Sequence, residues 1–248
     1  MSMNITRINA LLEALAEGRP LNQVLLSDQL KGGRAQKIKK LCQQRGILYR
    51  FVPKDALDRK TGRDHQGVFA QMSPIRFCPL SQIIRPGGRG LVVVLHNIFD
   101  PHNLGAIVRS CVGAGVDGIV ISQKKTAPVN ETVLKVSAGA LLKARIVYSR
   151  QIVRDIATLK DHGFWVAGAD IGGGIPYHRY DFTEKTALIL GNESKGISPN
   201  LKKITDQIIN IPLTGVIDSL NVSVACGIIL FEANRQKHLL HSGQNVGS

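Results

Sequence analysis

The 248-residue sequence predicts an α/β protein in two parts, a small α/β amino-terminal domain and a larger domain built on a mainly parallel sheet. From residue 91 onward, short runs of Leu, Ile and Val alternate with helical segments, the pattern of a parallel sheet covered on both faces. Residues 72–90 carry three of the ten prolines and three glycines, which is typical of a linker. The length suits two domains of about 100 to 200 residues each. The predicted boundaries are 1–71 for the first domain, 72–90 for the linker and 91–248 for the second domain.

The amino-terminal part shows the pattern of a small folded domain. The segment ITRINALLEALAEG places Ile5, Ile8, Leu12 and Leu15 at helical spacing, and Gly18 is the expected C-terminal stop. Three short apolar strands follow, with a polar helix between the first two. The strands are QVLLS, ILYRFV and GVFAQM, and the helix lies around KGGRAQKIKKLCQQRG.

Net charge is the strongest compositional signal, with a formal value of +14 and a pI of about 9.9. Residues 1–70 hold 13 Lys and Arg against 6 Asp and Glu, so positive charge is denser there than in the rest of the chain. Such an excess favours a polyanionic partner, because each neutralised phosphate releases counterions. A charge excess that serves only solubility is the alternative at this point.

Two clusters of cations in the first domain are candidate RNA contacts. One lies on the polar helix and the other in a glycine-containing loop before His65, which we interpret as a structural histidine. A basic helix and a basic loop on one small domain are suited to grip folded RNA by its backbone, although a charge run is also typical of a solvated face. The residues are Arg34, Lys37, Lys39 and Lys40 on the helix and Arg59, Lys60 and Arg63 in the loop.

The cysteines indicate neither a zinc site nor a disulfide framework, because they are far apart in the sequence and never form CxxC. We interpret Cys42, Cys78, Cys111 and Cys226 as buried thiols in a reducing cytosol, and we expect no metal site. No apolar run approaches the roughly 18 residues of a membrane span, and the first helix does not resemble a signal peptide. A soluble, cytoplasmic protein is therefore expected.

The second domain is expected to alternate strands and helices, with its chemistry at the carboxyl ends of the strands. The predicted strands are LVVVL, GIVIS, RIVYS, FWVAGAD, TALILG and QIINIPL, and the predicted helices begin at Asn103, Asn130, Arg150, Ser198 and Ser219.

One motif match in this domain is rejected. Gly113, Gly115 and Gly118 satisfy GxGxxG, but they follow a predicted helix and precede a predicted strand. The dinucleotide fingerprint requires the opposite order, so that a helix N-terminus meets the pyrophosphate. A nucleotide-dependent oxidoreductase is therefore disfavoured.

Two apolar runs near the carboxyl terminus each end in a glycine-bearing polar loop. Glu193 follows directly after the first run, and Ser219 and Asn221 lie where the last helix is expected to begin and to expose free backbone N–H groups. Because parallel strands deliver their loops at one edge, we expect the two loops to lie side by side and to bind a small ligand. Helix capping by Asp218 or Ser219 is the plainer interpretation. The segments are LILGNESKGISP (188–199) and INIPLTGVIDSLNVSVACGIILFEANRQ (209–236).

The first strand of this domain leads into HNIFDPHNLGAIVRSCVGAG. Asp100 and Pro101 make a turn, and Asn103 is expected to start and cap a helix. Arg109 lies six residues further along, among mostly apolar positions. An arginine in that setting is either a surface charge or an anion clamp, and a cap that points into the same crevice favours the clamp.

Three of these segments together carry a family resemblance. DPHNLGAIVRS, LILGNESKGIS and IPLTGVIDSLNVSVACGIILFEA resemble, in order and spacing, the three motifs of the SpoU family of RNA ribose 2′-O-methyltransferases, within the SPOUT superfamily. The amino-terminal part, with NALLEAL near its start and HQGVFA near its end, is similar to the substrate-binding domain of bacterial members that methylate a guanosine ribose in 23S ribosomal RNA. The resemblance covers nearly the whole chain.

The resemblance implies more than the residues alone show. It implies S-adenosylmethionine as cofactor, a homodimer formed through the catalytic domain, and a carboxyl-terminal trefoil knot, which no pattern argument would propose. The cofactor would be held by the backbone of Gly191, Ile211 and Leu220. The implied substrate is a guanosine in the peptidyl-transferase loop of 23S ribosomal RNA, as free RNA or in a large-subunit assembly intermediate. The implied polar active-site set is Asn103, Arg109, Glu193, Ser219 and Asn221.

Methyl transfer to a ribose hydroxyl requires alignment and the removal of a proton from a very weak acid. The family's proposed activator is Arg109, yet a guanidinium keeps its proton in proteins. We therefore hypothesise that Arg109 binds the adjacent phosphate or the hydroxyl oxygen and stabilises the forming alkoxide, with Asn103 fixing the arginine. Glu193 and Asn221 would orient the ribose and hold the loops together.

Two alternatives stay open. A transfer-RNA ribose methyltransferase would share the catalytic motifs, and the amino-terminal domain favours ribosomal RNA over it. A ribosome assembly factor with an inactive methyltransferase fold would keep the basic first domain and lose polar loop residues, whereas the full set is present in this sequence.

Overall fold

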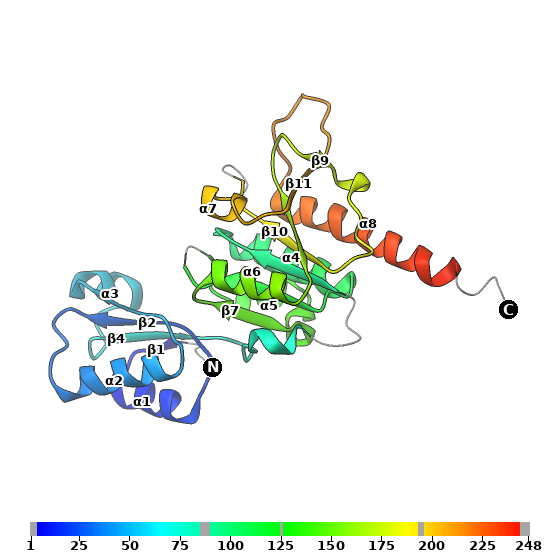
Figure 1. Ribbon diagram of the computed structural model, residues 1–248. Coiled ribbons are helices and arrows are strands. Elements are labelled where there is room, and N and C mark those ends of the chain that lie inside the picture. The colour runs from blue at the N-terminus through cyan, green and yellow to red at the C-terminus, as the bar shows by residue number, and fades with distance from the viewer. Residues whose placement is uncertain (1–3, 85–89, 125, 193–195, 244–248) are drawn as a thin grey trace. The chain divides into compact units, whose positions relative to one another are not determined.

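The computed structural model describes residues 4–84, 90–124, 126–192 and 196–243, with side chains described as far as Lys237. The chain folds into two compact units, each with its own sheet (Figure 1). The first unit comprises Met1–Arg76 and Pro128–Asn130, and the second comprises Phe77–Ala127 and Glu131–Ser248.

The first unit is built on a four-stranded mixed sheet in the order β1-β4-β2-β3. β2 pairs in parallel with β3 and antiparallel with β4, and β1 adds a short antiparallel edge to β4. All three strands predicted in this region are present. The strands are β1 (Asn4–Ile5), β2 (Leu21–Ser27), β3 (Tyr49–Val52) and β4 (Val68–Met72), and the helices are α1 (Ile8–Glu17), α2 (Gly33–Gln44) and α3 (Lys54–Thr61).

The first helix is shorter than its apolar spacing predicted. Ile5 is paired with Ala70 in the β1–β4 ladder, so its assignment to the helix is wrong. α1 ends as predicted at Gly18, whose φ of 70° is the left-handed conformation that glycine adopts without strain. The side chains that α1 buries are Ile8, Leu11, Ala14 and Leu15.

Helix α3 occupies most of the stretch that was predicted to be a basic loop. Arg59 and Lys60 lie in its last turn, and Arg63 lies in the loop that follows. The helix buries only Leu57, so its sequence carries almost no apolar periodicity to detect. His65 is structural, as predicted: its side chain is 2% exposed, its Nε2 lies 2.7 Å from Oδ1 of Asp58, and its Nδ1 accepts a backbone hydrogen bond.

The second unit contains a seven-stranded sheet in the order β7-β6-β5-β10-β8-β11-β9. Each ladder described within it is parallel, which confirms the predicted sheet. The two-residue edge strand β9 was not predicted. The strands are β5 (Leu91–Leu95), β6 (Gly118–Ser122), β7 (Ile146–Ser149), β8 (Trp165–Ala169), β9 (Ile175–Pro176), β10 (Thr186–Leu190) and β11 (Gln207–Asn210).

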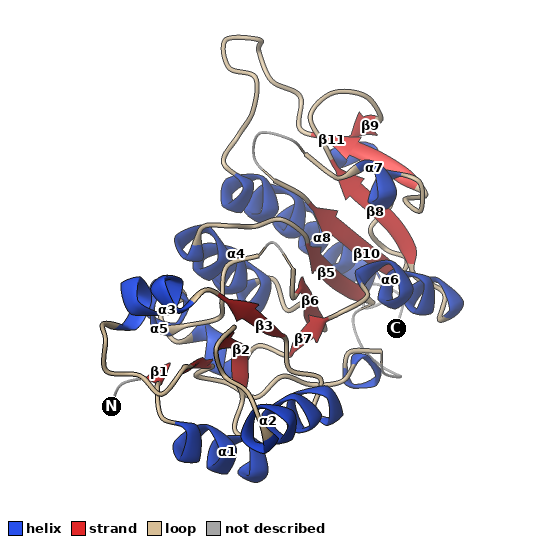
Figure 2. Cartoon of the chain, turned by 90° about the vertical axis from the view of Figure 1, so that its left-hand side faces the viewer, coloured by secondary structure: helices blue, strands red, loops and turns tan. Residues whose placement is uncertain are grey.

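Helices cover both faces of this sheet. α4 packs against α5 and α8 on one side, and α6 packs on β6 and β8 on the other (Figure 2). Within the described ranges, no helix combines the length and the hydropathy that a bilayer crossing requires. The helices are α4 (Pro101–Gly113), α5 (Glu131–Val136), α6 (Ile152–Asp161), α7 (Pro199–Lys202) and α8 (Val222–Gly243), with 3-10 turns at η1 (Leu80–Gln82), η2 (Ala140–Lys143) and η3 (Tyr177–Arg179).

All five helices of this unit begin one to three residues away from the predicted start, and the difference matters for α4 and α8. α4 begins at Pro101 and is capped by Asp100, whose carboxylate accepts a 2.8 Å hydrogen bond from the backbone N–H of His102. Asn103 is therefore the third helical residue and not the cap. α8 begins at Val222.

The cap of α8 is Asn221. Its Oδ1 accepts a 2.9 Å hydrogen bond from the backbone N–H of Ser223, the second helical residue. Asp218 and Ser219 precede this cap, so the interpretation of either as a capping residue is wrong.

The glycines of the rejected motif follow the expected order of elements. Gly113 ends α4, Gly115 turns the chain at a φ of 70°, and Gly118 lies in β6. Helix therefore precedes strand, which confirms that the match is not a nucleotide fingerprint.

Candidate active site

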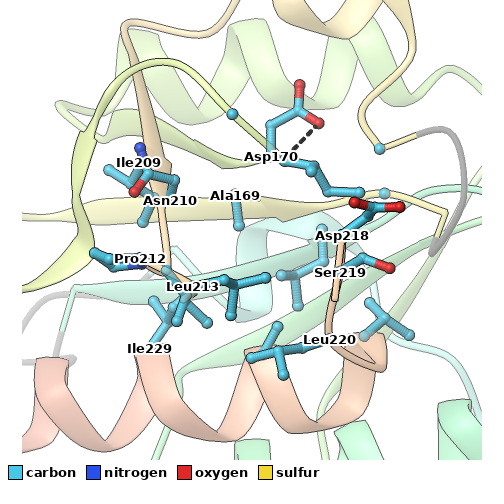
Figure 3. Close-up of a pocket in the computed structure, with 18 of the residues that line it drawn as sticks. Ala169, Asp170, Ile209, Asn210, Pro212, Leu213, Asp218, Ser219, Leu220 and Ile229 are labelled. Carbon is cyan, nitrogen blue, oxygen red and sulfur yellow. Dashed lines mark hydrogen bonds between the residues drawn. The ribbon is translucent and has the colours of Figure 1, made fainter. Parts of the chain in front are cut away.

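A cavity of about 410 Å³ lies at the carboxyl ends of β8, β10 and β11 (Figure 3). Its wall is formed by the loops that follow these strands and by the first turns of α8. In Figure 3, Asp170 lies across the cavity from Leu220 and Ile229, and Ser219 lies at one end. Because the loops after β10 and β11 both line the cavity, the prediction that they lie side by side is confirmed.

All three residues predicted to hold the cofactor line this cavity. Gly191 is buried at the end of β10, and Ile211 and Leu220 are partly buried on the loop between β11 and α8. Ser219, from the predicted polar set, lines the same cavity next to Leu220. These positions meet only through the fold, since 29 residues separate Gly191 from Leu220.

Gly191 and Gly196 lie where the loop after β10 turns back on itself. The backbone groups of Asn192 and Gly196 exchange two hydrogen bonds, of 3.0 and 2.8 Å. A Cβ on residue 191 would overlap the backbone carbonyl of Gly196. Gly196 has a φ of 59° and its α-carbon lies against the carboxylate of Asp170. The close approach therefore requires glycine at both positions.

Asp170 is a cavity residue that the sequence analysis missed. Its side chain is 5% exposed and forms an ion pair with Lys202 of α7. Its Oδ1 also accepts a 2.9 Å hydrogen bond from the backbone N–H of Ile171. A nearly buried carboxylate requires such partners. The signal was present, because Asp170 ends the predicted strand FWVAGAD at the edge of the sheet where ligands bind.

A hydrogen bond joins the first and third motif segments. The Nδ2 of Asn221 donates to Oδ1 of Asn103 at 3.0 Å, across 118 positions of sequence. The Oδ1 of Asn221 accepts from the backbone N–H and the hydroxyl of Ser223, at 2.9 and 2.6 Å. These two acceptor contacts fix the direction of the Asn221 amide, so its N–H group points toward α4.

Arg109 is exposed on α4, about 9 Å of helix rise beyond Asn103. No hydrogen bond between these two residues occurs in the part of the chain that the structure describes, and the amide oxygen of Asn103 accepts from Asn221. The predicted contact in which Asn103 fixes the arginine is therefore not made. Glu193, the remaining member of the predicted polar set, lies outside the described residues.

The thiols include one pair that the sequence did not indicate. Burial raises the pKa of the Cys111 thiol on α4 well above its ordinary value, and a hydrogen bond with Cys226 of α8 raises this pKa further. All four cysteines are free; Cys42, Cys111 and Cys226 are buried as predicted, whereas Cys78 is partly exposed. Among the residues described, no group of three or more His, Cys, Asp or Glu side chains is placed to hold a metal ion.

The cations predicted to bind RNA fall on two faces of the first unit. α1 and α2 cover one face of its sheet, where Ile38 packs against Val24 and Val68. α3 lies on the opposite face, with Nζ of Lys60 5.0 Å from the ring centre of Phe69 (Figure 1). The α2 cluster and the α3 cluster therefore lie on opposite faces of the sheet.

Comparison with protein families identifies both units. Residues 90–231 match the SpoU rRNA Methylase family, and residues 8–78 match the family described as RNA 2′-O ribose methyltransferase substrate binding. A TrmH family tRNA/rRNA methyltransferase, as it is named, from Staphylococcus aureus (strain MSSA476) is 32% identical over 234 residues, which cover 93% of this chain and 94% of that protein.

Solved structures give the same result. The SpoU methyltransferase AviRb from Streptomyces viridochromogenes, in complex with the cofactor AdoMet, has a TM-score of 0.60 at 25% identity and covers 95% of this chain and 90% of its own. The AdoMet-bound rRNA methyltransferase from Sinorhizobium meliloti has a TM-score of 0.60 at 25% identity, over 94% of this chain and 87% of its own. A TrmH/SpoU tRNA modifying enzyme from A. aeolicus has a TM-score of 0.58 at 32% identity, over 65% of this chain and 82% of its own.

The segment matched at residues 90–231 contains the seven-stranded sheet, the cavity and the motif segments as far as Phe231, and the match at residues 8–78 covers most of the first unit. The chain therefore belongs to the SpoU rRNA methylase family and carries the family's RNA substrate-binding domain at its amino terminus.

Proposed function

We propose that this protein transfers a methyl group from S-adenosylmethionine to the 2′-hydroxyl of a guanosine in 23S ribosomal RNA. The coarser statement follows from family membership: the protein is an RNA ribose 2′-O-methyltransferase that uses S-adenosylmethionine. The observation that carries the proposal is the cavity in which the loops after β8, β10 and β11 meet beside the Asn103–Asn221 hydrogen bond.

The cavity suits this cofactor. Its volume of about 410 Å³ lies within the range of small-molecule sites, and its wall combines apolar side chains with exposed backbone groups of strand-end loops. When bound, S-adenosylmethionine supplies a methyl group on a positively charged sulfur. We expect the backbone of Gly191, Ile211 and Leu220 to bind the adenosyl part. Asp170 and Ser219 are polar groups within reach of the same cavity.

The residues of this chain must then position the ribose and stabilise the oxygen of its 2′-hydroxyl as the proton leaves. We infer that the Asn103–Asn221 bond holds the start of α4 against the start of α8, so that the ribose site has a fixed width. Arg109, exposed on the same helix, would bind the adjacent phosphate or the hydroxyl oxygen and stabilise the alkoxide, since a guanidinium does not act as a base. Glu193 and Ser219 are proposed to orient the ribose.

Ribosomal RNA is supported as substrate over transfer RNA by the extent of the likeness. The rRNA methyltransferase from S. meliloti covers 94% of this chain, whereas the tRNA modifying enzyme from A. aeolicus covers 65%. We propose a guanosine of the peptidyl-transferase loop, in free RNA or in a large-subunit assembly intermediate. A tRNA ribose methyltransferase is the alternative, because the S. aureus relative is named for both RNAs.

The first unit is proposed to bind the RNA through the cations of α2 and α3. Arg34, Lys37 and Lys40 are exposed on α2, and Arg59, Lys60 and Arg63 are exposed at the end of α3 and in its following loop. An assembly factor that binds RNA without catalysis would need the same cations. It would not need the Asn103–Asn221 hydrogen bond or the cavity that Gly191 and Gly196 line, so both features support an enzyme.

A homodimer through the second unit is supported by an exposed apolar face of α8. Val224 and Phe231 are seven residues apart, about two helical turns, and are 49% and 52% exposed. We propose that this face packs against a second copy. Sedimentation of the wild type and of Phe231→Glu tests this: the wild type is expected to sediment as a dimer and the variant as a monomer.

The trefoil knot of the family is also proposed for residues after β10. The tight approach of the loops at Gly191, Gly196 and Asp170 is consistent with a chain that passes through a loop at this point. Pulling both chain ends in a single-molecule instrument is expected to leave a shorter final length than the full chain would give, because a tightened knot retains residues.

Two measurements test the proposed reaction. Calorimetry with S-adenosylmethionine and S-adenosylhomocysteine should give binding and a rise in Tm, and the absence of both would exclude the enzyme. Mapping ribose methylation in the RNA of cells with and without this protein should show one guanosine of 23S ribosomal RNA that loses its methyl group. Loss at a tRNA position would select the alternative. The proposed site of action is the cytoplasm.

A further inference from the structure

Phe51 is an exposed aromatic side chain on the edge strand β3 of the first unit. β3 is the last strand of the order β1-β4-β2-β3, and the side chain of Phe51 is 42% exposed. Phe69, on the opposite face of the same sheet, is 2% exposed and belongs to the interior. Phe51 therefore contributes little to the core of the first unit.

Phe51 and three residues in contact with it or with each other form a small surface that we call the Phe51 platform; the other three are Tyr49, Gln43 and Lys39. Tyr49 lies two residues earlier, on the same face of β3, and the two rings meet edge to face with centres 6.4 Å apart. Nε2 of Gln43 donates to the hydroxyl of Tyr49 at 3.3 Å. Nζ of Lys39 lies 4.8 Å from the centre of the Phe51 ring. Since Lys39 and Gln43 are four residues apart on α2, one edge of this helix follows β3.

The charge around this platform is of one sign. α2 carries Arg34, Lys37, Lys39 and Lys40, and neither α2 nor β3 contains an Asp or Glu; Arg50 of β3 lies on the opposite face of the sheet from Tyr49 and Phe51. In the described part of the chain, no carboxylate pairs with any of these five cations. The α3 cluster differs, because Asp55 and Asp58 belong to the same helix. The α2–β3 surface is therefore the better site for a polyanion.

We propose that Phe51, supported by Tyr49 and Lys39, stacks on an unpaired nucleobase of the RNA substrate while the α2 cations bind the flanking phosphates. The inference rests on the proposed function, which it deepens by assigning a contact to a single-stranded part of the RNA. Stacking on an aromatic ring is open to every base but requires a base that is not enclosed in a duplex. The ammonium of Lys39 lies over one face of the Phe51 ring, so the base would stack on the other face and Lys39 would contact the phosphate of the stacked nucleotide.

The test measures the affinity of the full-length protein for two fluorescent probes by anisotropy. One probe is a 12-nucleotide oligouridylate and the other is a perfectly paired 12-base-pair RNA duplex. Phe51→Leu removes the aromatic face and keeps an apolar side chain of similar bulk, whereas Phe51→Trp keeps an aromatic face. Trp165→Leu is the matched control, since Trp165 is 59% exposed at the start of β8, the end remote from the cavity.

Phe51→Leu is expected to weaken single-strand binding by about 5- to 150-fold, the range measured when one base–aromatic stack is removed. Phe51→Trp should bind at least as tightly as the wild type, and duplex affinity should change less than about twofold in both Phe51 variants. Lys39→Gln should lower the magnitude of the slope of log affinity against log salt by about 0.7, whereas Phe51→Leu should leave the slope unchanged. Trp165→Leu should match the wild type in all assays.

Unchanged single-strand affinity of Phe51→Leu, or no single-strand binding by the wild type, would overturn the platform. Equal losses for both probes would also overturn it, because a duplex offers no free base face. Methyl transfer and S-adenosylmethionine binding are measured on the same preparations. A wild type that binds the single strand through Phe51 but neither binds the cofactor nor methylates RNA would contradict the proposed function and leave the platform in place. Melting temperatures confirm that each variant is folded.

Discussion

The side chains of Asn103 and Asn221 are joined by a 3.0 Å hydrogen bond, although 118 residues separate them in the sequence. The bond ties the first turn of α4 to the cap of α8. Asn221 also caps α8 by accepting a hydrogen bond from the backbone N–H of Ser223. The Asn221 side chain therefore both caps α8 and fixes α8 against α4. The two polar motif segments therefore converge on one place next to the cavity.

This bond predicts a matched pair of variants at residue 221. Asn221→Asp keeps an oxygen that caps Ser223 but removes the N–H that reaches Asn103, so it should retain the Tm and lose turnover by about tenfold or more. Asn221→Ala should also lose about 1 kcal/mol of stability with the cap. Asn103→Ala combined with Asn221→Asp should be no slower than the slower single variant, since both remove one contact. Additive losses in kcat would show that the two side chains act separately.

Arg109 is predicted to act through the geometry of its guanidinium. Arg109→Ala should lower kcat by about 100- to 1000-fold, as for the loss of one group that stabilises a developing oxyanion. Arg109→Lys keeps the charge but loses the planar guanidinium group with its paired N–H donors, the fork, so its kcat should lie between those of Arg109→Ala and the wild type. Arg154→Lys, an exposed change on α6, is the control and should be silent. Near wild-type turnover of Arg109→Lys would exclude a role for the fork.

Gly191 is predicted to tolerate no side chain. Gly191→Ala would place a Cβ on the carbonyl of Gly196, so the loop must move, and the affinity for S-adenosylmethionine should fall at least about tenfold in calorimetry. Gly227→Ala is the matched control on α8, since its Cβ would meet only Ser110, at 3.7 Å. That change should be neutral or should stabilise by about 0.5 to 1 kcal/mol, because glycine weakens a helix interior. Equal effects at the two positions would refute the close-approach argument.

The Asp170–Lys202 pair gives a prediction about the wall of the cavity. Lys202→Met leaves the nearly buried Asp170 carboxylate without its cation, which should cost about 1 to 3 kcal/mol of unfolding free energy. Asp170→Asn should cost less, since Lys202 is 46% exposed and can be solvated. The double variant should recover part of the Lys202→Met loss in urea denaturation. A Lys202→Met protein as stable as the wild type would show that the pair is dispensable.

The raised pKa of the Cys111 thiol predicts a loss of stability at alkaline pH. The fold favours the neutral thiol, first through burial and then through the hydrogen bond with Cys226. Below the unfolded-state pKa, about 8.5, this contribution is fully present; as pH rises above that value the unfolded chain releases the proton first and stability falls. Urea denaturation from pH 7 to pH 10 should show a steeper decline for the wild type than for Cys111→Ala. Parallel curves would contradict this.

Local patterns determined the main features of the second unit. Runs such as LVVVL and TALILG are apolar throughout because a parallel strand is buried on both faces, and β5 and β10 are buried at all five positions. The polar loops after such strands open at one edge of the sheet, so the loop after β10 and Ser219 were expected near one ligand. The family resemblance, and not the loop pattern, added Gly191, Ile211 and Leu220. They line one cavity.

The same reasoning failed where a segment has little apolar pattern. α3 buries only Leu57, and its charged sequence was expected to be a loop. Helix ends were also displaced, because Asp100 and Asn221 could cap as well as Asn103 and Ser219, and only the backbone geometry selects among neighbouring capping residues.

The sequence by itself determined the parallel sheet, the positions of its polar loops, the density of cations in the first unit and the family motifs, because each depends on residue type and short-range spacing. Only the tertiary structure decided which distant side chains meet. In the second unit, the order β5-β10-β8-β11 places Asp170 beside Gly196, and α4 packs against α8. In the first unit, the packing on the sheet β1-β4-β2-β3 places the α2 and α3 cations on its opposite faces. Strand order is set by the packing of the whole chain, so no local pattern records it.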